Sequence, residues 1–285
     1  MSPGLQRWLP LAPAAVVSLY WVIGLIVFAA RGAIWGVRHD RELEGRAPSL
    51  LIGSFLRDYF GWIIRPFWRL ILASGISPNQ VTVAAMLIGG GAGLAVAFGR
   101  FALGGWLFIL SGILDTFDGR LARSRNQVTV AGAAFDSLLD RYVDGAMLIG
   151  LAYYFRGSWA LLAALGAIFG TSMVPYVRAK AESLGVTMKD GLMQRPERVF
   201  TLGIAMVLSP WVEALWPAAS GHSSQRVAAI SILVLAITSN TTAIGRIARL
   251  LAALRQGTPT PLPAAATSAP GKSRTAPPRP RLVRT

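Results

Sequence analysis

The chain has 285 residues, of which 53% are hydrophobic and only 14% are charged, with a formal net charge of +15 and no cysteine. Soluble domains carry about 25% charged residues, so this composition excludes an ordinary soluble domain and favours a polytopic membrane protein. Without cysteine, disulfides and thiolate metal sites are excluded. A basic excess is typical of cytoplasmic loops that contact anionic lipid headgroups. We expect no nucleic-acid binding, because no recognised binding motif accompanies the charge.

Seven segments are apolar over the roughly 20 residues that a bilayer-spanning helix needs. They are residues 12–36, 80–99, 102–118, 131–154, 158–178, 199–216 and 227–245. The first is too long for the apolar region of a signal peptide, which favours an uncleaved anchor. We therefore predict an all-α polytopic membrane protein. It has a six-helix transmembrane core, preceded by an interfacial amphipathic helix and by one extra N-terminal transmembrane helix.

The basic residues predict how these spans are oriented. If the segment between the first two spans is cytoplasmic, the loops and tail on that side hold 22 Lys and Arg residues, and the opposite side holds four. An excess of Lys and Arg marks the cytoplasmic side of a membrane protein. We expect a multi-pass protein of the cell membrane with residues 114–145 at its cytoplasmic face.

Residues 54–75 combine aromatic side chains with Arg57, Arg65 and Arg69, which indicates an amphipathic helix in the membrane interface. We expect a break or kink in it near Pro66. Ser77 or Asn79 can cap the helix that follows. Three domains are predicted: 1–53 (anchor and cytoplasmic linker), 54–250 (the membrane domain) and 251–285 (a disordered, basic, Pro-rich tail).

Acidic residues gather in the otherwise apolar stretch 114–145. Five of the chain's 13 acidic residues lie there: Asp115, Asp118, Asp136, Asp140 and Asp144. The first two are three residues apart and the others follow at intervals of four, so each set shares one helix face. The two helices meet at a short loop, and we expect their carboxylates to converge on one point.

These carboxylates require positive partners, since an Asp at the bilayer centre costs about 2.5–3.5 kcal/mol. Arg123 and Arg141 are nearby, but two arginines cannot neutralise five carboxylates. Oxygen ligands without Cys or a local His favour Mg²⁺ or Mn²⁺. The alternative is a set of snorkelling residues at helix ends, which does not explain the alignment on two facing stripes. Gly119, Ala122 and Gly132 leave room beside the carboxylates for a ligand or for a helix crossing.

The pattern resembles the signature of the CDP-alcohol phosphotransferase (CDP-alcohol phosphatidyltransferase) family. Matching residues are Asp115-x-x-Asp118-Gly119-x-x-Ala122-Arg123, then eight residues, then Gly132-x-x-x-Asp136-x-x-x-Asp140. The resemblance extends from about residue 54 to 250 and implies a homodimer with a cytoplasm-facing site. It implies two metal ions, Mg²⁺ or Mn²⁺, held by Asp115, Asp118, Asp136 and Asp140, which bind the diphosphate of CDP-diacylglycerol. It also implies nucleotide contacts at Asp118, Gly119, Ala122, Arg123 and Gly132, with Asn79 and Thr82 as weaker candidates.

Asp140, the last aspartate of the signature, is our candidate for the base that accepts the proton of the incoming hydroxyl. A second basic cluster, at residues 176–199, suits an acceptor that carries a phosphate. Its candidate residues are Arg178, Lys180, Arg195 and Arg198. This stretch, with Asp140-Arg141 and Asp144-Gly145, resembles phosphatidylinositol phosphate synthases, which implies inositol 1-phosphate as the acceptor. Glycerol 3-phosphate, the acceptor of phosphatidylglycerophosphate synthases, is the nearest alternative.

Three more distant functions remain as rivals. A membrane prenyltransferase also binds a diphosphate through aspartate-rich helices, but it would need two separate motifs where this chain has one cluster. A cation transporter would also place carboxylates in the membrane, but the acids gather at one side and no inverted repeat is evident. A catalytically inactive scaffold is disfavoured, because all four aspartates of the signature are present.

Overall fold

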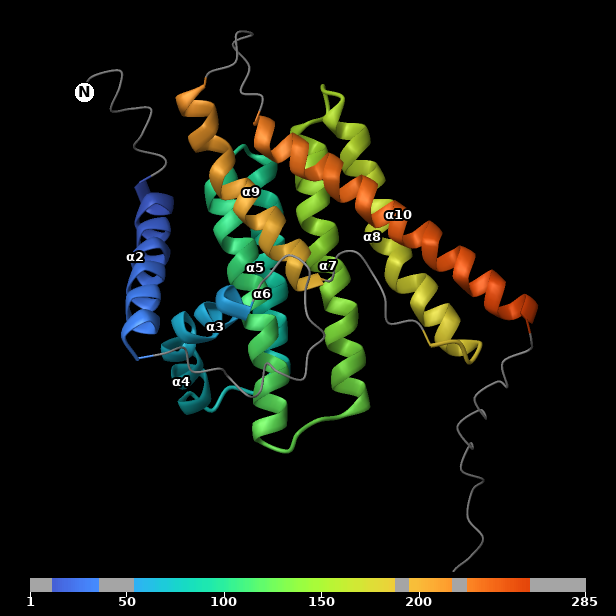
Figure 1. Ribbon diagram of the computed structural model, residues 1–285, viewed down its shortest axis with the longest axis horizontal. Coiled ribbons are helices and arrows are strands. Elements are labelled where there is room, and N and C mark those ends of the chain that lie inside the picture. The colour runs from blue at the N-terminus through green and yellow to red at the C-terminus, as the bar shows by residue number, and fades with distance from the viewer. Residues whose placement is uncertain (1–11, 36–53, 188–194, 217–224, 257–285) are drawn as a thin grey trace, which may run out of the picture.

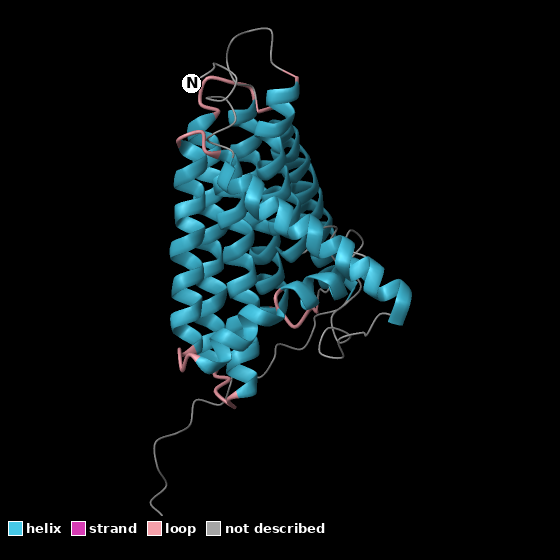
Figure 2. Cartoon of the chain, turned by 90° about the vertical axis from the view of Figure 1, so that its left-hand side faces the viewer, coloured by secondary structure: helices cyan, strands magenta, loops and turns pink. Residues whose placement is uncertain are grey.

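The structure, a computed structural model, describes residues 12–35, 54–187, 195–216 and 225–256. All of the regular structure in these residues is helical (Figures 1 and 2). The helices are α2 (Ala12–Trp35), α3 (Ser54–Ile63), α4 (Arg65–Ala73), α5 (Pro78–Ala97), α6 (Phe101–Ser124), α7 (Val130–Tyr154), α8 (Ala160–Ser183), α9 (Arg195–Leu215) and α10 (Arg226–Gln256). Of the predicted disordered tail 251–285, residues 251–256 are instead the last turns of α10, because the helix continues past its apolar segment. The other domain boundaries stay predictions, since residues 36–53 and 257–285 lie outside the described residues.

Six of the described helices are long and apolar enough to cross a membrane: α2, α5, α6, α8, α9 and α10. The predicted span 131–154 forms α7, which has 25 residues but carries Asp136, Asp140, Arg141 and Asp144 and is not among those six. It nevertheless packs against both α5 and α8 inside the bundle. The predicted fold class, an all-α polytopic membrane protein, is confirmed.

Several helices extend past the ends of their apolar segments. We predicted spans ending at residues 118, 178 and 245, whereas α6, α8 and α10 end at Ser124, Ser183 and Gln256. Their last turns contain Arg123, Lys180 and Arg255. A basic side chain stabilises the negative end of a helix, so these helices can continue beyond the apolar layer.

The six core helices, α5 to α10, pack largely as neighbouring pairs. Helix α5 lies against α6 and α7, α6 against α9, and α8 against α10. Helices α5 and α7 approach closely at Gly93, where a Cβ atom would collide with the backbone of Ala146. Small residues permit such close backbone contact in membrane helices.

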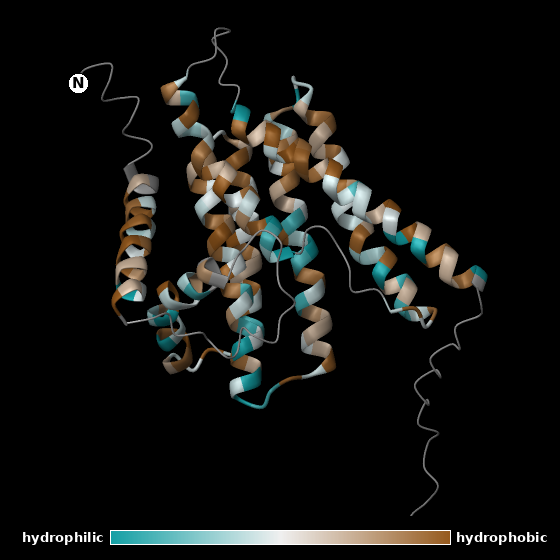
Figure 3. Cartoon of the chain, in the orientation of Figure 1, coloured by the Kyte–Doolittle hydropathy of each residue, from teal (hydrophilic) through white to brown (hydrophobic). Residues whose placement is uncertain are grey.

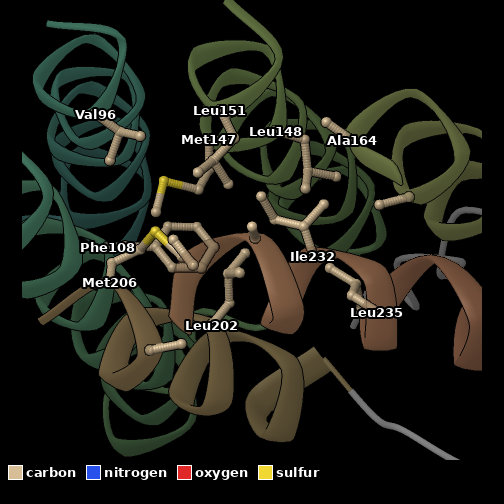
Figure 4. Close-up of a cluster of buried hydrophobic side chains, with 14 of the residues drawn as sticks. Val96, Phe108, Met147, Leu148, Leu151, Ala164, Leu202, Met206, Ile232 and Leu235 are labelled. Atoms are coloured by element: carbon tan, nitrogen blue, oxygen red, sulfur yellow. The ribbon is translucent and has the colours of Figure 1, made fainter. Parts of the chain in front are cut away.

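One half of this bundle forms the main apolar core (Figure 4). It joins the N-terminal half of α6 to the C-terminal half of α7 and to α8, α9 and α10. Its fully buried side chains include Phe108, Met147, Leu151, Met206 and Ile232. Figure 3 shows hydrophilic residues on α6 and α7 between the middle of the bundle and the loop that joins these two helices.

The interfacial segment folds as α3 and α4, which are interrupted at Ile64 with Pro66 in the first turn of α4. This agrees with the break expected near Pro66. Helix α2 packs on α3 through Phe28, whose ring contacts those of Phe55, Tyr59 and Trp62. Burial raises the pKa of Tyr59 to about 12, so its hydroxyl stays protonated and donates to the backbone carbonyl of Trp21.

Helix α5 begins with a capping box. The hydroxyl of Ser77 accepts a hydrogen bond from the backbone N–H of Gln80, and the side chain of Gln80 accepts one from the N–H of Ser77. Of the two residues that we considered as caps, Ser77 has this role. The box defines where α5 starts, and Asn79 and Thr82 lie within its first turns.

Candidate metal and substrate site

The aspartates of α6 and α7 meet where these helices approach the N-terminus of α9. One carboxylate oxygen from each of Asp115, Asp118 and Asp136 lies within 4.8 Å of the other two. Spacing along each helix places the acids on one face, and α5, which packs against both α6 and α7, brings these faces together beside α9. The structure therefore brings together three of the four metal ligands that the resemblance implies.

Asp118 is held by hydrogen bonds from two neighbours. Its carboxylate accepts one from the hydroxyl of Thr82 on α5, at 2.7 Å, and one from the N–H of Gly119. Both Asp118 and Thr82 are buried. Thr82, which we predicted as a nucleotide contact, thus orients an aspartate of the cluster.

One oxygen of Asp136, Oδ1, is buried and has no hydrogen-bond partner in the described structure. A buried carboxylate oxygen without a partner is costly, and a cation would satisfy it. Oxygen ligands suit a hard divalent ion. The residues present therefore fit the metal that the sequence pattern implies.

Asp140 lies next to this group of three and contacts Arg195. The guanidinium of Arg195 bridges two helices, since Nη1 lies 2.6 Å from Asp115 Oδ2 and Nη2 lies 2.7 Å from Asp140 Oδ1. We had weighed only Arg123 and Arg141 as partners for the aspartates. Arg195 is 80 residues from Asp115 in the sequence, so no local spacing indicates this pair. The one signal in the sequence is that five carboxylates need more positive charge than two arginines supply.

A second arginine of α9 pairs with the fifth aspartate. Arg198 donates through Nη2 to Asp144 Oδ2, and both side chains are buried. We had given Asp144 no role in the site. The remaining two candidates of the basic cluster lie apart on α8, where Arg178 pairs with Glu182 at 2.8 Å and Lys180 is exposed.

The predicted nucleotide residues line the ends of three helices. A Cβ atom at Gly119 would lie 3.4 Å from Arg123 Nη1, so Arg123 folds back over this glycine. A Cβ atom at Gly132 would lie 3.8 Å from Asn79 Oδ1, so the start of α7 faces the start of α5. Ala122 is half-buried on the last turn of α6.

An open pocket of about 320 Å³ adjoins Gly132, between α5 and α7. Its lining residues are Asn79, Gln80, Val83 and Phe135. Sequence reasoning named only Asn79. The other three are ordinary helix residues whose position beside the site depends on how α5 packs against α7.

Comparison with known proteins identifies the family. The family model described as CDP-alcohol phosphatidyltransferase matches residues 75–238, which is more than half of the chain. The chain belongs to the CDP-alcohol phosphatidyltransferase family. The matched residues include the whole aspartate cluster and both arginines of α9, whereas α2, α3 and α4 precede the match. The protein is therefore a transferase of this family.

Two relatives within the CDP-alcohol phosphatidyltransferase family have names that describe enzymes of lipid synthesis. Phosphatidylinositol phosphate synthase of Mycobacteroides abscessus is 30% identical over 191 residues, covering 64% of this chain and 84% of that protein. Archaetidylinositol phosphate synthase of Methanothermobacter thermautotrophicus is 38% identical over 152 residues, covering 53% of this chain and 77% of that protein.

Solved structures of one family member resemble this fold. Phosphatidylinositol phosphate synthase of Mycobacterium tuberculosis, in a crystal structure with CDP-DAG bound, is 25% identical, with a TM-score of 0.57. The match covers 65% of this chain and 92% of that one. A second crystal structure of the same protein is a complex with manganese and citrate. That relative binds a metal, and the aspartate cluster described above can hold one.

Proposed function

We propose that this protein transfers the phosphatidyl group of CDP-diacylglycerol to inositol 1-phosphate. The products are phosphatidylinositol phosphate and CMP. The observation that carries the proposal is the partly buried contact of Arg195 with Asp115 and Asp140. A guanidinium, which suits a phosphate, there lies directly beside carboxylates suited to a metal. The names of the two inositol phosphate synthases support this acceptor.

Asp115, Asp118 and Asp136 would hold the metal, with Asp140 as the fourth ligand residue. We propose two ions, Mg²⁺ or Mn²⁺. Such ions, when bound, neutralise the charge of a diphosphate and orient it for displacement. Thr82 holds Asp118 in its orientation through the 2.7 Å hydrogen bond, which limits the freedom that this ligand would lose on binding.

The reaction requires an alcohol oxygen to attack the phosphorus next to the diacylglycerol. A new P–O bond forms, the P–O bond to CMP breaks, and the alcohol loses its proton. We assign Asp140 as the acceptor of this proton. It contacts Arg195, which is proposed to bind the phosphate of the acceptor, so the hydroxyl of that acceptor would lie near Asp140. Arg123, at the end of α6 over Gly119, would stabilise the departing CMP.

Binding of the nucleotide is proposed along Asn79, Gly119, Ala122 and Gly132. This region adjoins the open pocket between α5 and α7, which offers space for part of the CDP-lipid. Arg195 and Arg198 would bind the acceptor phosphate. Arg178 and Lys180 stay predictions for that role, since they lie on α8 with Arg178 paired to Glu182.

The site is proposed to face the cytoplasm in the cell membrane. The loop between α6 and α7 and the C-terminal ends of α8 and α10 point toward the same end of the molecule (Figure 1), and their last turns are basic. A homodimer is also proposed, on the family resemblance. The mass of the detergent-solubilised protein tests it.

An acceptor panel tests the proposed function. Purified protein with CDP-diacylglycerol and Mg²⁺ is offered inositol 1-phosphate, glycerol 3-phosphate, inositol and serine separately, and lipid products are identified by mass. We expect CMP release and a lipid product only with inositol 1-phosphate. A product with glycerol 3-phosphate would instead indicate a phosphatidylglycerophosphate synthase. Absence of CMP release with every acceptor would contradict the proposal.

A further inference from the structure

Asp144 is the one aspartate of residues 114–145 to which the proposed reaction assigns no role. It lies on α7, one turn beyond Asp140, and only 7% of its surface is exposed. A buried carboxylate in a membrane helix is costly unless it is paired. Its partners therefore indicate why it is there.

The ion pairs of Asp144 in the described residues are with two arginines from the first turn of α9, and Arg141 on its own helix lies close enough to interact electrostatically. Asp144 Oδ2 accepts a hydrogen bond from Arg198 Nη2, and the side chains are 8% and 9% exposed. Asp144 Oδ1 faces Arg195 Nε at 3.9 Å. Asp144 Oδ1 and Arg195 Nε are buried and have no hydrogen-bond partner in the described part of the chain. A small movement of either side chain would form a hydrogen bond between them.

Asp144 meets Arg195 on a different edge from the other aspartates. The Nη atoms of Arg195 point to Asp115 and Asp140, and its Nε points to Asp144. A guanidinium has five donors in a rigid, planar fork. An arginine held through Nε keeps its Nη donors directed toward the reacting side of the cluster.

We propose that Asp144 is a positioning residue, which holds Arg195 and Arg198 in place to receive the phosphate of the acceptor. It thereby favours a phosphorylated acceptor over the unphosphorylated alcohol. This inference rests on the proposed function. Without the carboxylate, two buried guanidinium groups would face each other with one negative partner fewer, and repulsion would move them away from a shared phosphate.

The test compares Asp144→Asn with Asp144→Glu, which restores the charge. Glu213→Gln, at the far end of α9, is the matched control for loss of one carboxylate. We expect Asp144→Asn to raise KM for inositol 1-phosphate about tenfold or more, with KM for CDP-diacylglycerol changed less than about twofold. Asp144→Glu should recover most of the loss, and Glu213→Gln should behave as the wild type.

A second measurement does not depend on turnover. Inorganic phosphate should raise the thermal unfolding midpoint of the wild type and of Glu213→Gln, and raise that of Asp144→Asn clearly less. Should Asp144→Asn fail to fold, Asp144→Asn/Arg198→Gln replaces it, because this double variant removes both charges of the buried pair. Because Arg198 is itself proposed to bind the phosphate, the double variant is compared with Arg198→Gln alone. A further rise in acceptor KM and a still weaker response to phosphate are expected in the double variant, since Arg195 has then also lost Asp144.

Equal increases in both KM values, an unchanged acceptor KM, or an undiminished response to phosphate would overturn the role of Asp144. The absence of any product from the wild type with a phosphorylated acceptor would contradict the proposed function instead. In that case the response to inorganic phosphate still decides whether Asp144 positions an anion-binding pair.

Discussion

The two halves of the helix bundle are built on opposite principles. In the apolar half, Phe108, Met147 and Met206 are fully buried and pack against one another's helices. In the charged half, the same three helices, α6, α7 and α9, contribute aspartates and arginines that are also largely buried. The change occurs within about two turns on each helix. The apolar half holds the helices in position, and the charged half holds groups that a substrate can engage.

Ion pairs and apolar contacts differ in what can replace them. Apolar packing in lipid depends on shape, because lipid tails are as apolar as the side chains. A buried arginine or carboxylate must keep a partner of opposite charge, and a phosphate or a cation can serve as that partner. Substitutions in the charged half should therefore alter turnover and substrate binding, and substitutions in the apolar half should alter stability.

Removal of divalent cations should have the largest effect, because it affects all the carboxylates of the charged half at once. We expect excess chelator to abolish CMP release and added Mg²⁺ or Mn²⁺ to restore it, with the fold unchanged by circular dichroism. A rate that is undiminished in chelator would contradict the metal site.

Asp140→Asn should reduce turnover by about 10²–10⁴-fold, the range typical of general acid–base catalysis. Binding of CDP-diacylglycerol should survive, because Asp115, Asp118 and Asp136 remain to hold a metal. Steady-state rates and a direct lipid-binding measurement separate these quantities. Loss of both would mean that Asp140 is needed chiefly to hold the metal or the fold, and would contradict its role as the base.

Arg195→Ala should raise KM for the phosphorylated acceptor by roughly 10–100-fold, since charge-assisted hydrogen bonds contribute about 1.5–3 kcal/mol. KM for CDP-diacylglycerol should rise less. Kinetics at saturating concentrations of each substrate in turn measure this difference. Equal increases would indicate that Arg195 serves only to hold Asp115 and Asp140.

In the apolar half, Phe108→Ala should lower stability and leave both KM values nearly unchanged. The cost should be somewhat below the ~3–5 kcal/mol of Phe→Ala in soluble cores, because lipid offers no hydrophobic driving force between helices. Thermal unfolding in detergent measures it. A large change in either KM with unchanged stability would show that the two halves are not separable.

The smallest effect is expected for Ser77→Ala, which removes the cap of α5 at the edge of the charged half. Loss of an N-cap costs about 1 kcal/mol, so the unfolding midpoint should fall by a few degrees. Ser74→Ala is the control, because the Ser74 hydroxyl donates to Ile71 in its own preceding helix. Equal shifts in the two variants would contradict the importance of the capping box.

Prediction from sequence succeeded where local pattern governs structure. The break before Pro66 and the cap at Ser77 follow from neighbours within one or two turns. Helical spacing places the acids on one face of α6 and one face of α7, whereas their convergence depends on α5, which packs against both helices. The true ends of α6, α8 and α10 were missed, because hydropathy alone does not detect a helix that continues with basic residues.

The sequence by itself determined the helical class and the signature that joins Asp115 to Asp140, because residues on one helix face follow a fixed spacing. Only the tertiary structure decided that Arg195 and Arg198 neutralise the aspartates. These pairs span 80 and 54 residues. Contacts of that separation depend on how α9 packs against α6 and on how α5 holds α7 beside them, and no spacing along one helix encodes them.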